Sequence, residues 1–213
     1  MGTKITMRDV AKEAGVSPMT VSRAFKQDAS VNAETRAQVQ KAADRLGYVY
    51  DATAQSFRAG RSGFVAVTLP SINNANFAST HRALTRALAQ SDLQLLLGVT
   101  NYNVEEEERH LRQLLARRPE AIVLTGGHHT DATRRMLSAM DVPVIEIWDL
   151  PPDPIAHVVG FSNARAMELV VDHLVGTGCR KLGFIGATGD TDKRGAERRN
   201  GVVHAARSRG LPD

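Results

Sequence analysis

Three side chains near the amino terminus, Pro18, Met19 and Arg23, are of types that can contact the edges of DNA bases. An arginine guanidinium can donate two hydrogen bonds to a guanine edge, and a methionine can pack against a base or a thymine methyl group. On a helix, Met19 and Arg23 lie one turn apart on the same face. The pattern indicates base recognition, although a small helical domain with Arg23 on an unpartnered surface fits the same residues.

These side chains lie in a segment with the features of two short helices joined by a tight turn. Thr6 is placed to begin the first helix, with Asp9 at its third position, and Gly15 to end it. Ser17 then precedes Pro18 at the first position of a second helix, where a missing N–H costs nothing. A third helix is predicted from Asn32 to Gly47. Hydroxyl and amide groups near such helix starts suit DNA phosphates, and the candidates are Ser17, Thr20, Ser22, Asn32 and Thr35.

The distribution of charge supports a polyanion-binding segment at this end of the chain. Residues 1–63 carry 10 basic and 6 acidic side chains, whereas residues 64–213 carry 17 of each. The whole net charge of +4 therefore lies in the first segment. A basic segment joined to a neutral body favours nucleic acid as a partner, although a basic surface alone does not require one.

The first part of the chain resembles a known family of DNA-binding proteins. The stretch Ile5-Thr-Met-Arg-Asp-Val-Ala-Lys-Glu-Ala-Gly-Val-Ser-Pro-Met-Thr-Val-Ser-Arg-Ala-Phe25 and the later Arg45-Leu-Gly-Tyr48 are similar to the headpiece of the LacI/GalR family of bacterial transcription regulators. This resemblance covers residues 5–61. It implies that Pro18, Met19 and Arg23 select the operator sequence.

The resemblance also implies a hinge helix that inserts an apolar side chain into the minor groove. In this chain the minor-groove residues would be Ala54 and Phe57. Phe57 stands where the family usually has leucine, and Tyr50-Asp51 replaces the common Pro-Asn entry. Alternatively, Phe57 packs between paired hinges or under the body of the protein.

The remainder of the chain predicts an α/β fold with a parallel sheet covered on both faces. Short apolar runs alternate with helical stretches, and the predicted strands are 64–69, 93–99, 121–124, 144–147, 158–161 and 182–185. This part resembles the periplasmic-binding-protein-like core of the same family, which continues beyond the corresponding position, so an incomplete second lobe is implied. The expected domains are a helix-turn-helix headpiece (1–50), a hinge (51–62), an N-terminal lobe (63–161) and a partial C-terminal lobe (162–213).

Polar and aromatic residues follow several predicted strands, where open parallel sheets bind ligands. A carbohydrate requires amide or carboxylate groups for its hydroxyls and an aromatic face for its C–H bonds. The candidate effector-binding residues are Ser71, Asn74, Phe77, His128, Trp148, Asp149, Asn163 and Arg198, the last two placed by the resemblance. Any one of them could instead bond an adjoining loop. Ser162 stands where the family usually has aspartate.

An acidic ligand is favoured because His128, His129 and Arg198 can supply charge-assisted hydrogen bonds. The strings Leu124-Thr-Gly-Gly-His-His-Thr130 and Val144-Ile-Glu-Ile-Trp-Asp149 are also similar to those of gluconate-utilisation repressors. A sugar acid such as gluconate, or its phosphate, is therefore the expected effector.

Other chemistry finds little support in the sequence. His128 and His129 are adjacent and lack a third ligand at a metal-site spacing, and Glu105–Glu108 is interpreted as a solvated helix face, so no metal or other cofactor is expected. No nucleophile–base order suggests an enzyme. The lone Cys179, the lack of a leader-like start and the lack of a long apolar run predict a cytoplasmic location and no membrane contact.

We therefore expect a sequence-specific transcriptional regulator, most simply a repressor of carbohydrate-utilisation genes. It would bind double-stranded operator DNA as a homodimer, because one headpiece reads only one half-site. A small sugar-type effector would release it from the operator or recruit it there. The alternatives are a sugar-binding receptor without a DNA role, which needs a leader, and a sugar-processing enzyme, which needs acid and base residues at the strand ends.

Overall fold

The computed structural model describes residues 5–26, 28–50, 62–186 and 192–212. The chain forms two compact units, Met1–Arg58 and Ala59–Asp213, and each is described by itself. The proposed hinge residues Ala54 and Phe57 lie outside the described residues.

The described residues of the first unit form the helices α1 (Met7–Glu13), α2 (Pro18–Phe25) and α3 (Ala33–Leu46). Small and β-branched side chains form its core, which lets the helices cross closely. The buried residues are Val10, Ala11, Ala14, Val21, Ala24, Val31, Val39, Ala42 and Ala43. An ion pair between Arg45 and Glu13 also joins α3 to α1.

The predicted helix starts and stops of this unit are confirmed. Thr6 and Asp9 form a capping box at the start of α1. The Ser17 side chain accepts the backbone N–H of Thr20 at the start of α2, and Asn32 caps α3 in the same way. Gly47 ends α3 in the left-handed conformation, which glycine adopts without steric cost.

The second unit is built on a five-stranded parallel sheet with the strand order β2-β1-β3-β4-β5. The strands are β1 (Phe64–Leu69), β2 (Gln94–Val99), β3 (Ala121–Thr125), β4 (Val144–Trp148) and β5 (His157–Gly160). The helices are α5 (Ala75–Ala89), α6 (Val104–Leu115), α7 (Asp131–Ser138), α8 (Asn163–Gly176) and α9 (Lys193–Ser208). The predicted parallel α/β fold is therefore confirmed.

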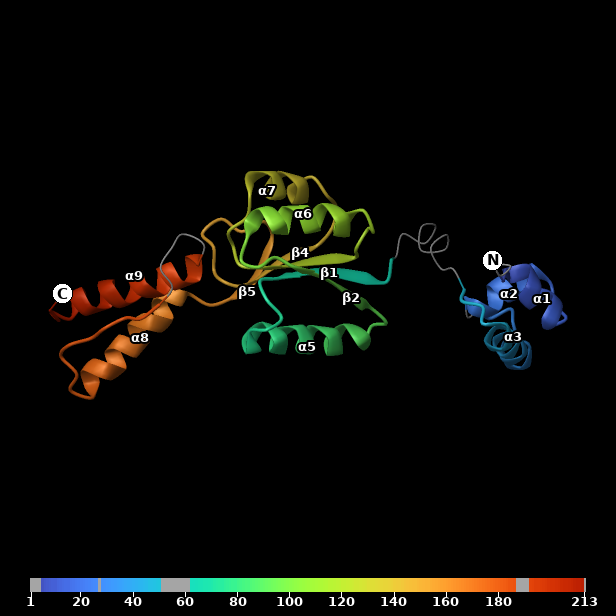
Figure 1. The fold of residues 1–213 in the computed structure, drawn as a ribbon, viewed down its shortest axis with the longest axis horizontal. Coiled ribbons are helices and arrows are strands. Elements are labelled where there is room, and N and C mark those ends of the chain that lie inside the picture. Colours follow the sequence, from blue (N-terminus) through green and yellow to red (C-terminus); the bar gives the residue numbers. More distant parts are fainter. Residues whose placement is uncertain (1–4, 27, 51–61, 187–191, 213) are drawn as a thin grey trace. The chain divides into compact units, whose positions relative to one another are not determined.

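Helices cover both faces of this sheet, with α5 on one face and α6 and α7 on the other (Figure 1). Side chains alternate along each strand, so β1 contributes to two separate cores. Val65, Val67 and Leu69 pack toward α5 with Leu84 and Leu88. The other face holds Ala66, Leu111, Leu115, Ile122, Leu124, Leu137 and Val144. This layering places the carboxyl ends of all five strands at one edge of the sheet.

The sixth predicted strand, 182–185, is wrong. This segment has no regular secondary structure, and the Ile185 side chain is fully exposed. Apolar β-branched residues form a strand only where a partner strand supplies hydrogen bonds and a packed face. Within the described residues, β5 is the last strand of the sheet and pairs with β4.

Helices α8 and α9 pack against each other at a position that requires glycine. A Cβ atom on Gly201 of α9 would lie 2.6 Å from the carbonyl oxygen of Ala164 in α8. Gly201 therefore lets the two backbones approach closely and sets the position of the cationic residues at the start of α9. Among the described helices, none is both long and apolar enough to cross a membrane.

Candidate nucleic-acid interface and ligand cleft

One face of α2 presents the three predicted base-reading side chains to solvent. Pro18, Met19 and Arg23 are exposed, and the Met19 side chain is 63% accessible. On the opposite face of the same helix, Val21 and Ala24 are buried in the core of the unit. The helix is thus anchored on one side and bears an arginine and a methionine on the other, an arrangement suited to the major groove.

The predicted phosphate-contacting residues gather at helix starts. Ser17 and Asn32 both use a side-chain oxygen to cap their helices, with acceptor distances of 3.1 Å to the Thr20 N–H and 2.7 Å to the Thr35 N–H. The Asn32 side chain keeps its amide N–H groups as donors. Ser22, Thr20 and Thr35 are half-buried. Their roles toward phosphates stay predictions.

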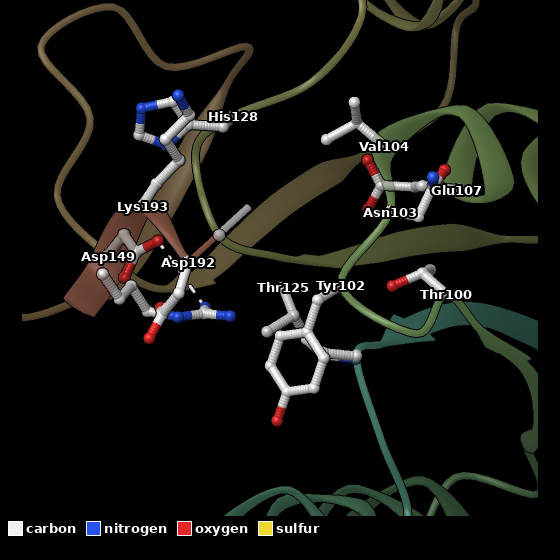
Figure 2. Close-up of a pocket in the computed structure, with 13 residues that line it drawn as sticks. Thr100, Tyr102, Asn103, Val104, Glu107, Thr125, His128, Asp149, Asp192 and Lys193 are labelled. Atoms are coloured by element: carbon white, nitrogen blue, oxygen red, sulfur yellow. Dashed lines mark ion pairs between the residues drawn. The ribbon is translucent and has the colours of Figure 1, made fainter. Parts of the chain in front are cut away.

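A cleft of about 970 Å³ lies in the second unit, beyond the carboxyl ends of the strands. Its lining includes six of the predicted effector-binding residues, namely Asn74, Phe77, His128, Trp148, Asn163 and Arg198. Asp149 lines an adjoining cavity of about 70 Å³, where Lys193 and Asp192 lie opposite the loops that follow β2 and β3 (Figure 2). Ser71 lines neither cavity, and its hydroxyl accepts the backbone N–H of Asn73.

Four aromatic residues form one wall of the cleft. Phe77 lies edge-on to Trp148 with ring centroids 5.3 Å apart, and Tyr102 and Phe161 extend the row at centroid distances of 6.2 and 6.0 Å. Trp148 has a φ of +81°, a strained conformation for a bulky side chain. Such strain, of about 1–3 kcal/mol, is commonly stored at binding sites. The wall offers an apolar surface to the C–H face of a ligand.

Polar groups of β4, α8 and α9 meet beside this wall. The Asn163 amide donates to Asp149 Oδ1 at 3.2 Å and accepts from the Arg198 guanidinium at 2.8 Å. Arg194 Nη1 lies 3.6 Å from Asp149 Oδ2, and the Arg194 guanidinium stands 5.4 Å from the centre of the Phe77 ring. Asp149 and Asn163 are buried, so this network holds two arginines at fixed positions.

The sequence interpretation missed Lys193 and Arg194, which line both cavities. In the sequence, the acidic neighbours Asp190 and Asp192 offset the charge of these two cations, and Asp190 lies outside the described residues. Asp192 instead caps α9 by accepting the N–H of Gly195, and it lies 3.8 Å from Arg198. The sequence feature that could have indicated their role is the presence of two cationic residues, Lys193 and Arg194, at the start of a predicted helix. Arg194 Nη1 is buried and has no hydrogen-bond partner among the described residues.

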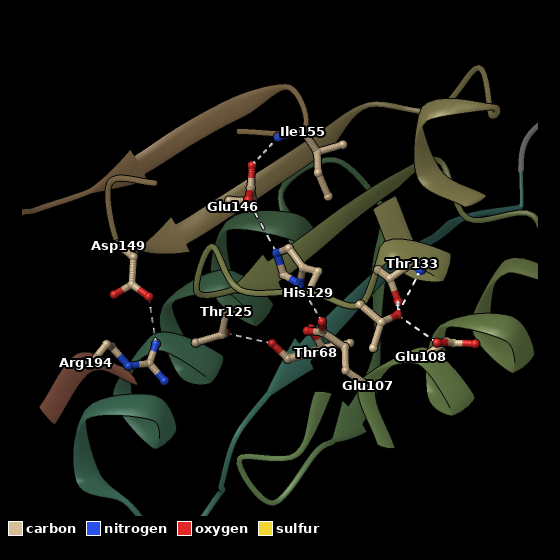
Figure 3. A network of polar contacts seen from close by, with 11 residues as sticks. Thr68, Glu107, Glu108, Thr125, His129, Thr133, Glu146, Asp149, Ile155 and Arg194 are labelled. Atoms are coloured by element: carbon tan, nitrogen blue, oxygen red, sulfur yellow. Dashed lines mark hydrogen bonds and ion pairs between the residues drawn. The ribbon is translucent and has the colours of Figure 1, made fainter. Parts of the chain in front are cut away.

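Two predictions about polar residues in this region are wrong. The acidic run in α6 is not wholly solvated, because Glu107 is buried and lies against the sheet. His129 does not offer its ring to a ligand either, since the ring lies between Glu107 and Glu146 (Figure 3). Burial by itself lowers the pKa of His129. The hydrogen bond that the ring donates to Glu107, the charge of Glu107 and the charge of Glu146 outweigh that effect and raise the pKa of His129.

The described residues hold no group of three or more histidine, cysteine, aspartate or glutamate side chains arranged to bind a metal ion. The fold and the two candidate sites instead define a class of protein in which a helix-turn-helix domain is joined to a ligand-binding parallel α/β domain.

Comparison with known proteins identifies the family within this class. Residues 6–51 match the model of bacterial regulatory proteins of the lacI family, and residues 62–213 match periplasmic binding proteins and the sugar binding domain of the LacI family. The chain belongs to the LacI family. Because this is a family of regulatory proteins, the prediction that the chain is not an enzyme is confirmed.

Similar proteins have the same two-part organisation. The HTH-type transcriptional regulator GntR of Pseudomonas aeruginosa is 38% identical over 98% of this chain and 60% of its own length. A LacI family regulator from Silicibacter pomeroyi, 36% identical, superimposes with a TM-score of 0.90 over 98% of this chain and 62% of that one. The Lac repressor dimer bound to operator, 23% identical, shares the fold with a TM-score of 0.81. The chain spans about three fifths of the length of these relatives.

Proposed function

We propose that the chain is a sequence-specific DNA-binding regulator, a repressor that reads its operator through α2 and responds to a sugar acid bound in the cleft. The observation that carries the proposal is the exposed face of α2. It presents Pro18, Met19 and Arg23 outward while Val21 and Ala24 fix the helix from behind. Side chains held on a rigid, anchored helix can discriminate base edges in the major groove.

Each such helix reads a short half-site, so a pair of chains related by a two-fold axis is the proposed operator-bound form. Ala54 and Phe57 would enter the minor groove between the half-sites. Phosphate contacts from Ser17, Thr20, Ser22, Asn32 and Thr35 would set the register without reading sequence. The regulator would act in the bacterial cytoplasm, where its operator lies.

The chemistry of the cleft supports an acidic carbohydrate as effector. Arg194, Arg198, Lys193 and His128 supply cationic or hydrogen-bonding groups, and the aromatic wall supplies an apolar face. Arginine binds a carboxylate with two parallel hydrogen bonds, and Arg194 Nη1, which faces Asp149 Oδ2 at 3.6 Å without a hydrogen bond, keeps its N–H groups for such a contact. Asn163 and Asn74 supply amides for hydroxyl groups. Gluconate fits this description because it has one carboxylate and a hydroxylated chain.

Selection of bound duplexes from a random pool, repeated with and without gluconate, tests both parts of the proposal. We expect the chain to enrich a palindromic site and gluconate to lower its affinity, since a ligand that favours the non-DNA-binding arrangement must weaken DNA binding. Affinity should also fall steeply with salt, as expected when phosphate contacts release counterions. If no sequence were enriched, the proposal that the chain is a sequence-specific regulator would be wrong. If a sequence were enriched equally with and without gluconate, only the proposal that gluconate is the effector would be wrong.

A further inference from the structure

A buried group of three ionisable side chains lies beneath the cleft. His129 follows β3 in the loop Gly126–Thr130, and its ring is flanked by Glu107 of α6 and Glu146 of β4. His129 Nδ1 lies 2.5 Å from Glu107 Oε2, and Nε2 lies 3.4 Å from Glu146 Oε1. None of the His129 side chain is exposed, and the two glutamate side chains are 6% and 1% exposed. Three polar side chains in one apolar core need a structural or functional reason.

The outer oxygens of both carboxylates accept hydrogen bonds from neutral donors. The Thr68 hydroxyl donates to Glu107 Oε1 at 2.9 Å, and the backbone N–H of Ile155 donates to Glu146 Oε2 at 2.7 Å (Figure 3). The other oxygen of each carboxyl group, Oε2 of Glu107 and Oε1 of Glu146, faces the His129 ring. Two buried carboxyl groups therefore face one imidazole ring, which can donate a hydrogen bond to each of them only when it is protonated.

The remaining charged groups near this cluster are paired with other partners. On α6, the next residue, Glu108, accepts hydrogen bonds from Thr130 and Arg112. On the cleft side, Asp149 faces Arg194 at 3.6 Å and bonds Asn163. Among the described residues, His129 is the group capable of positive charge that lies between Glu107 and Glu146.

The loop that carries His129 also forms part of the cleft. His128, the preceding residue, lines both the cleft and the adjoining cavity. Gly126 packs so closely that a Cβ atom there would lie 3.2 Å from Asp149 Oδ2 and 3.5 Å from Arg194 Nη1. A displacement of the loop would therefore move both the His128 side chain and the surroundings of the Asp149–Arg194 pair.

We propose that protonated His129 is the positioning residue of the Gly126–Thr130 loop and joins this loop by ionic contacts to α6 and β4. The conformational order of the loop, which forms part of the cleft, then depends on pH. The neutral ring could donate from only one nitrogen, so it would leave one buried carboxyl group without a hydrogen-bond donor and would supply no positive charge to either. This proposal concerns the loop itself and does not depend on which ligand occupies the cleft.

The direction of the pH dependence follows from the raised pKa of His129. A histidine whose pKa is higher in the folded state contributes stability that is fully present below the unfolded pKa of about 6.5. That contribution is lost as the pH rises through the folded value. The loop should therefore be most ordered near pH 6 and progressively less ordered toward pH 9.

Hydrogen–deuterium exchange of the 126–130 loop in the full 213-residue chain, corrected for the pH dependence of intrinsic exchange, measures this order. In the unsubstituted protein we expect protection to fall between pH 6 and pH 9, roughly tenfold for each unit by which the pKa is raised. His129→Gln should show low protection with no pH dependence. His128→Gln, which removes the neighbouring exposed histidine, should behave like the unsubstituted protein.

Glu146→Gln supplies a second test that keeps the histidine in place. Removal of one negative charge should lower the pKa of His129, so the loss of protection should end at a lower pH and be smaller in total. The same shift should appear in the NMR titration of the His129 ring protons. Protection that stays constant from pH 6 to pH 9 would overturn the proposal. So would a measured His129 pKa at or below about 6.5 in the unsubstituted protein, a result that does not require any variant to fold.

Discussion

Replacement of Arg23 by alanine is the most direct test of base recognition by α2. Arg23 is exposed, whereas Val21 and Ala24 on the other side of the helix are buried. The truncation therefore leaves the core unchanged, and we expect the free energy of unfolding to change by no more than about 0.5 kcal/mol. A lost bidentate contact with a guanine costs about 1–3 kcal/mol, which is roughly 5- to 150-fold in affinity for each half-site. In a complex of two chains related by a two-fold axis, both half-sites lose this contact, so the total loss of binding free energy doubles.

Fluorescence anisotropy with the selected duplex and a scrambled duplex of equal length would measure this loss. We expect Arg23→Ala to lose affinity for the selected duplex and to bind the scrambled duplex only slightly less tightly, because one positive charge is removed. Arg23→Lys keeps that charge without the planar pair of donors and should also lose discrimination. Lys41→Ala removes the same charge from an exposed position on α3 and serves as the matched control.

The reasoning would be refuted if Arg23→Ala weakened binding to both duplexes equally. That result would make Arg23 a phosphate contact, as any arginine near the backbone can be. Equal behaviour of Arg23→Ala and Lys41→Ala would have the same meaning.

Three further predictions concern the supports of the two sites. Ser17→Ala removes the side-chain cap of α2 and should lower the free energy of unfolding of the first unit by about 1 kcal/mol. Urea denaturation followed by circular dichroism measures this change, and an unchanged midpoint would contradict a stabilising role of the cap. Gly201→Ala places a Cβ atom against the backbone of Ala164 and should lower the stability of the second unit by about 1–3 kcal/mol in thermal unfolding, whereas Gly176→Ala, which has open space, should not. Arg194→Gln should weaken gluconate binding about tenfold or more in calorimetry, because a charge-assisted hydrogen bond contributes about 1.5–3 kcal/mol; equal affinities would remove Arg194 from the ligand site.

Most of the fold follows from local features of the sequence. The helices of the first unit begin at residues whose side chains satisfy free backbone N–H groups, so Ser17 and Asn32 mark helix starts without any tertiary information. The central strands β1 and β3 are nearly continuous apolar runs because they are buried on both faces. The segment 182–185 has the same composition and forms no strand, since strand formation also needs a neighbouring strand, which composition does not reveal.

The candidate sites were predictable to different extents. The exposed face of α2 could be predicted because helix periodicity alone separates exposed Met19 and Arg23 from buried Val21. In the cleft, the rule that ligands bind beyond strand ends located Phe77 and Trp148, although Ser71 follows a strand as well and lies outside both cavities.

By itself, the sequence determined the order of elements, the exposed face of the second helix and the edge of the sheet where a cleft forms, because each depends on neighbours close along the chain. Only the tertiary structure decided which polar residues are buried together. Glu107, His129 and Glu146 are far apart in sequence and come from a helix, a loop and a strand, so their interaction depends on sheet register and helix packing. The same holds for Arg194, whose role depends on how α9 approaches Asp149. Charge and burial at these positions follow from long-range contacts, which local periodicity does not encode.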